Sequence, residues 1–186
     1  MKNSFYLLFA GILFFQNTFA QNKNIGNTSQ IQWLSIEEAY NRSQKEPKKT
    51  IVDVYTDWCG WCKVMDNKTY SNQTIIDYLN KNYYMVKLNA EAKNDISVGG
   101  IKYKFDTQKG ANEVAIALLQ GKLSYPTTVF LDQNFNMIQP IPGYFDSKEF
   151  HKIITFLGGD YYKKENFDTF KEGTYKNTFK DALPKL

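Results

Sequence analysis

Two cysteines three positions apart, Cys59 and Cys62, are the residues of this sequence whose type and spacing most directly suggest chemistry. The segment Cys59-Gly60-Trp61-Cys62 follows a β-rich run and precedes a helical stretch, so we expect it at a strand-to-helix junction. This spacing puts both sulfurs near one face of the first helical turn, where they can form a disulfide. At the helix N-terminus, unpaired amides and the helix dipole favour the thiolate of Cys59. Cys59 is therefore the expected nucleophile and Cys62 the resolving thiol.

Three other interpretations of the cysteine pair compete with this one. A permanent structural disulfide is disfavoured, because a loop of a few residues constrains the unfolded chain little. A closed zinc site lacks ligands, since the chain offers only two cysteines and one histidine, His151. A copper(I) carrier would have suitably soft ligands in Cys59, Cys62 and Met65, and it stays open as an alternative. The pattern favours a redox-active disulfide that needs no prosthetic group and no metal.

Composition limits the other classes of function. The 186 residues are 42% hydrophobic and 23% charged, which is typical of a globular chain. The net charge of +4 is modest, and Arg42 is the only arginine. Because arginine forks are the usual readers of phosphates and base edges, nucleic-acid binding is not expected. A single His151 is expected to be structural on a helix, since its sequence neighbours are apolar.

The N-terminus has the pattern of a cleaved secretory signal, residues 1–20. Lys2 precedes the uncharged apolar run 5–15, and small residues precede a cut before Gln21. A membrane anchor is the alternative, but the run is shorter than the ~20 residues that span a bilayer. We therefore expect a periplasmic or secreted protein, without stable membrane insertion after cleavage, that works where disulfide chemistry is allowed. The polar residues 21–30 are expected to be a flexible lead-in.

The rest of the chain predicts a mixed β-sheet with helices on both faces, an α/β fold. Ser35 and Glu38 form a capping box for a helix, and Ser71 is the expected cap of a second. The expected strands are 31–34, 49–56, 83–88, 101–105, 127–131 and 135–138, and the later expected helices are 72–81, 112–120 and 148–157.

Two segments fall outside this regular alternation. Residues 94–122 are an expected insertion that adds a strand and a helix beside the substrate groove. Residues 159–186 are an expected C-terminal extension, in which Phe167 and Phe170 would pack one helical turn against the main domain, residues 31–158.

Several ordered features resemble the thioredoxin superfamily, specifically the exported bacterial thioredoxin-like thiol–disulfide oxidoreductases. The strand 51–55 followed by the cysteine segment is similar to the family's active-site segment. Asp53 lies six residues before Cys59, like the family's buried aspartate, and Lys87 on the next strand resembles its lysine partner. The resemblance implies a thioredoxin fold in which Asp53 takes up the Cys62 proton.

A second set of features continues the resemblance. Tyr125-Pro126-Thr127 is similar to the family's cis-proline segment, which faces the cysteine pair, and Gly143 falls where the family has a glycine after a hairpin. The resemblance implies that Tyr125 and Thr127 offer backbone groups to an extended substrate. Substrate contacts are also expected from three residues beside the cysteines, Trp58, Gly60 and Trp61.

The expected activity is protein-disulfide reduction in exported proteins, recharged by a separate thiol–disulfide electron donor. Trp61 replaces the proline that thioredoxin has between its cysteines, so thioredoxin's redox potential is not transferred directly. A disulfide oxidase or isomerase with the same site, a non-enzymatic thioredoxin-like binding module and the copper(I) carrier remain alternatives.

Overall fold

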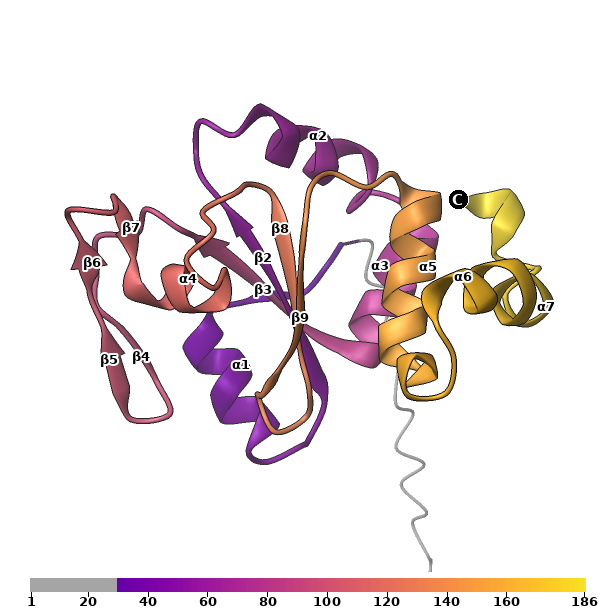
Figure 1. Cartoon of the computed structure of the whole chain (residues 1–186), viewed down its shortest axis with the longest axis horizontal. Helices are drawn as coiled ribbons and strands as arrows, with labels where there is room; N and C mark the ends of the chain where they lie inside the picture. Colours follow the sequence, from indigo (N-terminus) through magenta and orange to yellow (C-terminus); the bar gives the residue numbers. More distant parts are fainter. Residues whose placement is uncertain (1–29) are drawn as a thin grey trace, which may run out of the picture.

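The computed structural model describes residues 30–186. The expected signal peptide, residues 1–20, lies outside the described residues, and so does the expected lead-in except for Gln30. The described chain forms a central mixed sheet with helices on both sides, as Figure 1 shows. This arrangement confirms the α/β fold expected from the sequence.

The central sheet has five strands in the order β1-β3-β2-β8-β9. Neighbours among β1, β3 and β2 run parallel, whereas β8 and β9 pair antiparallel. The strands are β1 (Trp33–Leu34), β2 (Lys49–Tyr55), β3 (Tyr83–Asn89), β8 (Thr127–Leu131) and β9 (Met137–Pro142). Because β2 is the central strand, the cysteine segment that follows it lies at the C-terminal end of β2, in the middle of the sheet.

Helices cover the two faces of the sheet with separate apolar cores. The first core lies under α1 (Ile36–Ser43) and α4 (Glu113–Leu118) and takes Val52 and Val54 from β2. The second lies under α2 (Gly60–Lys68), α3 (Gln73–Asn82) and α5 (Ser147–Gly158) and takes Ile51. Successive strand residues point to opposite faces, so Asp53 shares the second face with Ile51. The sheet thus directs Asp53 toward the side that carries α2.

Helix caps explain where two of these helices begin. Ser35 and Glu38 form the expected capping box: the Ser35 hydroxyl accepts the Glu38 amide at 3.1 Å, and the Glu38 carboxylate accepts the Ser35 amide at 3.0 Å. The expected cap at Ser71 is wrong. Asn72 caps α3 instead, because its side-chain oxygen accepts two amides of the first turn while the Ser71 hydroxyl donates back to the carbonyl of Asn67.

The segment 94–122 holds more strands than the sequence indicated. It contains two small antiparallel ribbons, β4 (Ile96–Val98) with β5 (Ile101–Tyr103) and β6 (Phe105–Asp106) with β7 (Ala111–Asn112), followed by α4. Strands of two or three residues are too short to show a periodic pattern. Gly99 in the first turn has φ of 60° and would meet the Tyr40 ring of α1 through a Cβ, so the hairpin packs beside α1 (Figure 1).

The turn after β8 also differs from expectation. The strand predicted at 135–138 is present but begins later: Phe135 lies in the turn with φ of 65°, and β9 runs from Met137 to Pro142, antiparallel to β8. Asp132 organises this turn by accepting the amides of Asn134 and Asn136 through its carboxylate.

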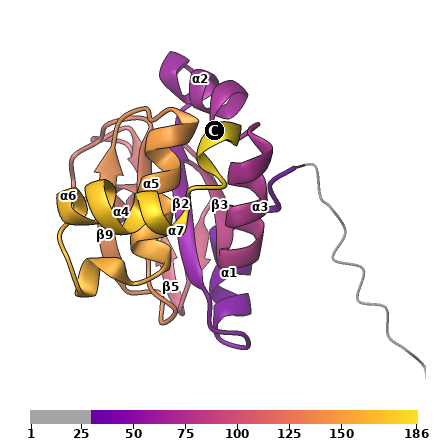
Figure 2. The ribbon, with the colours of Figure 1, turned by 90° about the vertical axis from the view of Figure 1, so that its right-hand side faces the viewer.

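The C-terminal residues form a chain of short helical pieces across α5 and α3, as Figure 2 shows. These are η1 (Tyr161–Lys163), α6 (Phe167–Thr169), a π-helical turn (Phe170–Thr174), α7 (Tyr175–Thr178) and η3 (Leu183–Lys185). Phe170 and Tyr175 are fully buried, while Phe167 is half-buried against the second core. More of this segment therefore packs on the domain than the single turn expected.

Candidate active site

Cys59 and Cys62 are joined by a disulfide at the start of α2. The S–S distance is 2.08 Å and the Cα atoms are 5.3 Å apart. Cys59 occupies the N-cap position, and its sulfur accepts the amide of Cys62 at 3.1 Å. Gly60 is the first helical residue. The pair therefore sits where free amides and the helix dipole stabilise negative charge on the Cys59 sulfur once the bond is reduced.

The two cysteines do not differ in exposure. Each is only 4% exposed in the disulfide form. The flanking tryptophans are open, with Trp58 68% and Trp61 61% exposed. Each cysteine is thus preceded in the sequence by an exposed tryptophan.

Asp53 and Lys87 form an ion pair on the sheet beneath α2. They are register partners on β2 and β3, and the Lys87 Nζ lies 2.6 Å from one carboxylate oxygen of Asp53. Asp53 is 1% exposed. Burial of an aspartate is costly without a partner, so the parallel register supplies the cation that the carboxylate needs.

A second carboxylate, which the sequence analysis missed, binds the same lysine. Asp66 on α2 also accepts a hydrogen bond from the Lys87 ammonium. Rings of Trp33, Tyr55 and Tyr70 surround the ammonium, with centroids 5.0, 5.1 and 5.4 Å from Nζ. The available signal was the spacing of Asp66, four residues after Cys62, which puts both on one face of α2.

The electrostatics of this group favour a carboxyl that binds a proton more readily than usual. Burial raises the pKa of Asp53 above its ordinary value, and the Lys87 ammonium opposes this rise without cancelling it. Burial by itself lowers the pKa of Lys87, but Asp53 and Asp66 outweigh it, so this pKa is also above its ordinary value. Asp53 thus has the character of a proton acceptor and Lys87 that of a fixed cation.

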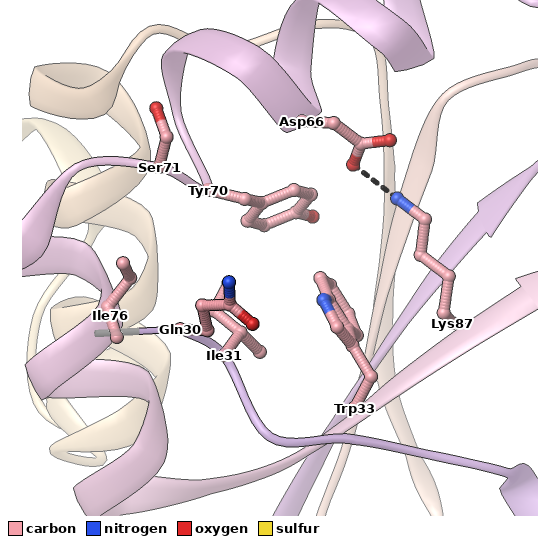
Figure 3. A pocket seen from close by; sticks show the side chains of 8 residues that line it. All are labelled: Gln30, Ile31, Trp33, Asp66, Tyr70, Ser71, Ile76 and Lys87. Atoms are coloured by element: carbon pink, nitrogen blue, oxygen red, sulfur yellow. Dashed lines mark hydrogen bonds and ion pairs between the residues drawn. The ribbon is translucent and has the colours of Figure 1, made fainter. Parts of the chain in front are cut away.

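A cavity of about 550 Å³ opens beside the pair (Figure 3). The figure shows Asp66 and Lys87 meeting at one end and the rings of Tyr70 and Trp33 facing the space between. Asp66 is 43% exposed at its side chain and Lys87 22%, against 2% for Asp53. Asp66, at the outer end, and part of Lys87 therefore reach solvent, whereas Asp53, at the inner end, does not.

The Tyr125–Pro126 peptide bond is cis, and it precedes the first residue of β8. The Pro126 carbonyl accepts the amide of Gly143 at 2.8 Å. Thr127 pairs with Val54 on one side and with Pro142 on the other, and it is buried. Thr127 is therefore part of the sheet, and Tyr125 is the half-exposed residue of the segment. The substrate contacts expected of both residues stay a prediction.

Aromatic pairs border the cysteine segment. Trp61 and Tyr144 lie with ring centroids 5.4 Å apart, and Trp58 meets Tyr125 edge to face at 5.9 Å. Trp61, Tyr125 and Tyr144 line a shallow groove of about 190 Å³ with Pro126 and Gly143. Glu91 fixes the other indole by accepting the Trp58 ring N–H at 3.0 Å. The sequence analysis missed Tyr144 and Glu91, although Tyr144 adjoins the predicted glycine.

Two other candidate residues lie outside this arrangement. His151 is buried on α5, and its Nδ1 lies 2.9 Å from the Tyr175 hydroxyl. Met65 is fully buried in the core with α3 and α5. Within residues 30–186, no group of three or more His, Cys, Asp or Glu side chains is arranged to hold a metal ion.

Comparisons with known proteins relate most of the chain to one family. Residues 23–158 match the family described as Thioredox_DsbH, a protein of unknown function (DUF255). Human spermatogenesis-associated protein 20 is 23% identical over 130 residues, covering 70% of this chain and 13% of that protein. The rat protein is 30% identical over 60 residues, covering 32% of this chain and 8% of its own length. The chain thus spans only a small part of these relatives.

Solved structures share the fold. A protein described as DsbH oxidoreductase aligns with a TM-score of 0.51 and 19% identity, covering 68% of this chain and 83% of its own. A thioredoxin-fold protein from Helicobacter pylori aligns with a TM-score of 0.56 and 17% identity, covering 76% of this chain and 84% of its own. No helix among the described residues is both long enough and apolar enough to cross a bilayer. The chain belongs to the Thioredox_DsbH family, within the thioredoxin superfamily of thiol–disulfide oxidoreductases.

Proposed function

We propose that this protein reduces disulfides of exported proteins through the Cys59–Cys62 dithiol. The observation that carries the proposal is the cysteine pair at the N-terminus of α2, on the sheet face that holds the buried Asp53–Lys87 pair. A disulfide that only stapled the fold would need neither a helix N-terminus nor a buried carboxylate beside it. Thiol exchange uses both, one to stabilise a thiolate and one to accept a proton.

The reaction begins with the reduced protein. The Cys59 thiolate attacks one sulfur of the substrate disulfide, forming a Cys59–substrate bond and releasing the other substrate sulfur as a thiolate. Cys62 then gives its proton to Asp53 and attacks the Cys59 sulfur. The Cys59–Cys62 bond forms, the second substrate thiolate leaves, and two electrons have passed to the substrate. A separate dithiol electron donor must then reduce the Cys59–Cys62 disulfide back to the dithiol.

The substrate segment is expected to lie in the shallow groove beside the cysteine segment. The groove is lined by the cis-proline segment and by the Trp61–Tyr144 pair. An extended chain there would bring its cysteine to the Cys59 sulfur. We also propose that the protein acts outside the cytoplasm, because residues 1–20 have the sequence pattern of a cleaved secretory signal. N-terminal sequencing of the exported form should give Gln21 as its first residue.

Trapping of the mixed disulfide tests the proposal. Cys62→Ser keeps the attacking sulfur and removes the resolving one, so it should accumulate a covalent complex with a protein disulfide such as oxidised insulin. Cys59→Ser is the matched control and should trap little. The wild-type protein should turn over insulin with dithiothreitol as electron donor. Absence of both trapping and turnover would leave the binding-module interpretation, and copper retained by the reduced protein would favour the carrier.

A further inference from the structure

Three side chains form a charged group near the start of α2: Asp53, Lys87 and Asp66. The Lys87 ammonium is bound by Asp53 from the sheet and by Asp66 from α2, and the centroids of three aromatic rings lie 5.0 to 5.4 Å from it. One cation is therefore divided between two anions. An ammonium held by two carboxylates stabilises each of them less than it would stabilise one alone.

Helix geometry ties Asp66 to the resolving cysteine. Cys62 and Asp66 lie four residues apart on α2, so they share the helix face that packs toward the sheet. Cys62 is buried there, and Asp66 reaches Lys87. The same helix turn that presents the thiol thus also presents the second carboxylate to the lysine that neutralises Asp53.

Three buried polar groups gather at the inner end of the group. They are the second carboxylate oxygen of Asp53, which Lys87 does not bind, and the hydroxyls of Tyr70 and Thr128, and the Tyr70 hydroxyl interacts with both Asp53 and Thr128. Thr128 is the register partner of Asp53 on β8. A proton on the second Asp53 oxygen would add a donor among these groups, where an ionised carboxylate adds only acceptors. This site therefore accommodates a protonated Asp53.

We propose that Asp66 is a positioning residue for the thiol chemistry: by sharing the Lys87 ammonium, it leaves Asp53 basic enough to take the proton of Cys62. This inference rests on the proposed function. The titratable groups that act on Asp53 are Lys87 from β3, Asp66 from α2 and Tyr70 from the segment after α2. The cavity beside Asp66 gives water access to the outer end of the group, where the proton can exchange.

Titration of Asp53 in the oxidised protein tests the inference without requiring activity. Carbon-13 NMR of the aspartate carboxyl groups follows Asp53 directly. Asp66→Asn is isosteric and removes a half-exposed charge, so the fold is retained, and the pKa of Asp53 should fall because Lys87 then serves one anion. Lys87→Gln should move it the other way. Asp77→Asn removes an equal charge from the exposed face of α3 and should leave it unchanged.

Kinetics supply the second readout. In Asp66→Asn, release of substrate thiol from the Cys59 mixed disulfide should slow roughly two- to fivefold on the neutral plateau, while the acidic limb of the pH profile moves to lower pH. An unchanged or raised Asp53 pKa in Asp66→Asn overturns the inference. If the wild-type protein releases no substrate thiol at any pH, the proposed function fails, and the NMR result still decides whether Asp66 controls Asp53.

Discussion

The Nδ1 atom of His151 on α5 lies 2.9 Å from the hydroxyl of Tyr175 on α7, and this contact fastens the C-terminal helices to the domain. The His151 ring also meets the rings of Tyr78 and Phe179, with centroids 5.4 and 5.5 Å away. A histidine surrounded in this way has a structural role, as its apolar neighbours in the sequence indicated. It also makes stability depend on pH.

Unfolding should become easier as the pH falls from about 6.5 to about 4. Burial lowers the pKa of His151 from 6.5 to about 4, so the unfolded chain binds a proton in this range that the folded chain does not. The free energy of unfolding contributed by neutral His151 is complete above pH 6.5 and should decline by about 2 kcal/mol toward pH 4, allowing for partial screening. Denaturant unfolding across this range measures the slope. His151→Asn should flatten it, and an equal slope in that variant would assign it to the carboxylates.

Phe170→Ala should destabilise the whole domain by about 3 to 5 kcal/mol, the usual cost of removing a buried phenylalanine. Phe170 is fully buried and packs against Phe156, Tyr161 and Tyr175. Phe167→Ala, three positions earlier and half-buried, is the control and should cost clearly less. Thermal unfolding followed by two spectroscopic probes checks this. Two separated transitions in Phe170→Ala would show that the C-terminal helices unfold independently.

Trp61→Ala should impair the reduction of protein disulfides more than that of small ones. Trp61 is exposed and its ring contacts Tyr144, so its loss removes a wall of the groove and little packing. We expect kcat/KM for insulin to fall about tenfold and the free energy of unfolding to change by less than about 0.5 kcal/mol. Ile101→Ala, an exposed apolar residue on β5, is the control. An equal loss with oxidised glutathione would place Trp61 in the chemical step instead.

The sequence predicted correctly those helices and strands whose structure depends on residues close to one another in the chain. The capping box at Ser35 and the β-rich run 49–56 are examples, because a cap and a buried strand depend on neighbours within a few positions. The Asp53–Lys87 pair came from the resemblance to a family, and the parallel register of β2 and β3 brings it about.

The missed features all depend on contacts between distant segments. The spacing in the sequence puts Asp66 on the same face of α2 as Cys62, but its contact with Lys87 depends on how α2 packs against β3. Tyr144 meets Trp61 across more than eighty residues of sequence. The cap of α3 is Asn72 and not Ser71. The two residues have similar capping propensity, and Asn72 also donates to the carbonyl of Lys185 at 3.0 Å, a contact with a distant part of the chain.

Alkylation of the reduced protein near neutral pH should modify Cys59 before Cys62. Cys59 is the N-cap of α2, where the helix dipole favours its thiolate, whereas Cys62 lies within the first turn, on the helix face that also carries Asp66. Limited iodoacetamide treatment followed by peptide mass mapping gives the ratio. Preferential labelling of Cys62 would reverse the two roles, and Cys59→Ser, rather than Cys62→Ser, would then trap substrate.

The reduction potential should be that of a reductant, more negative than about −180 mV. Strong oxidants owe their potential to a very stable thiolate, which needs positive charge near the attacking sulfur. Here Lys63, the cation next to the pair in sequence, is exposed, and Lys87 is bound by two carboxylates. An ionised Asp53 repels the thiolate and a neutral one does not attract it, so neither state makes Cys59 strongly acidic. Equilibration with glutathione buffers and thiol trapping measures the potential. A value near about −120 mV would make the protein an oxidase running the same exchange in reverse.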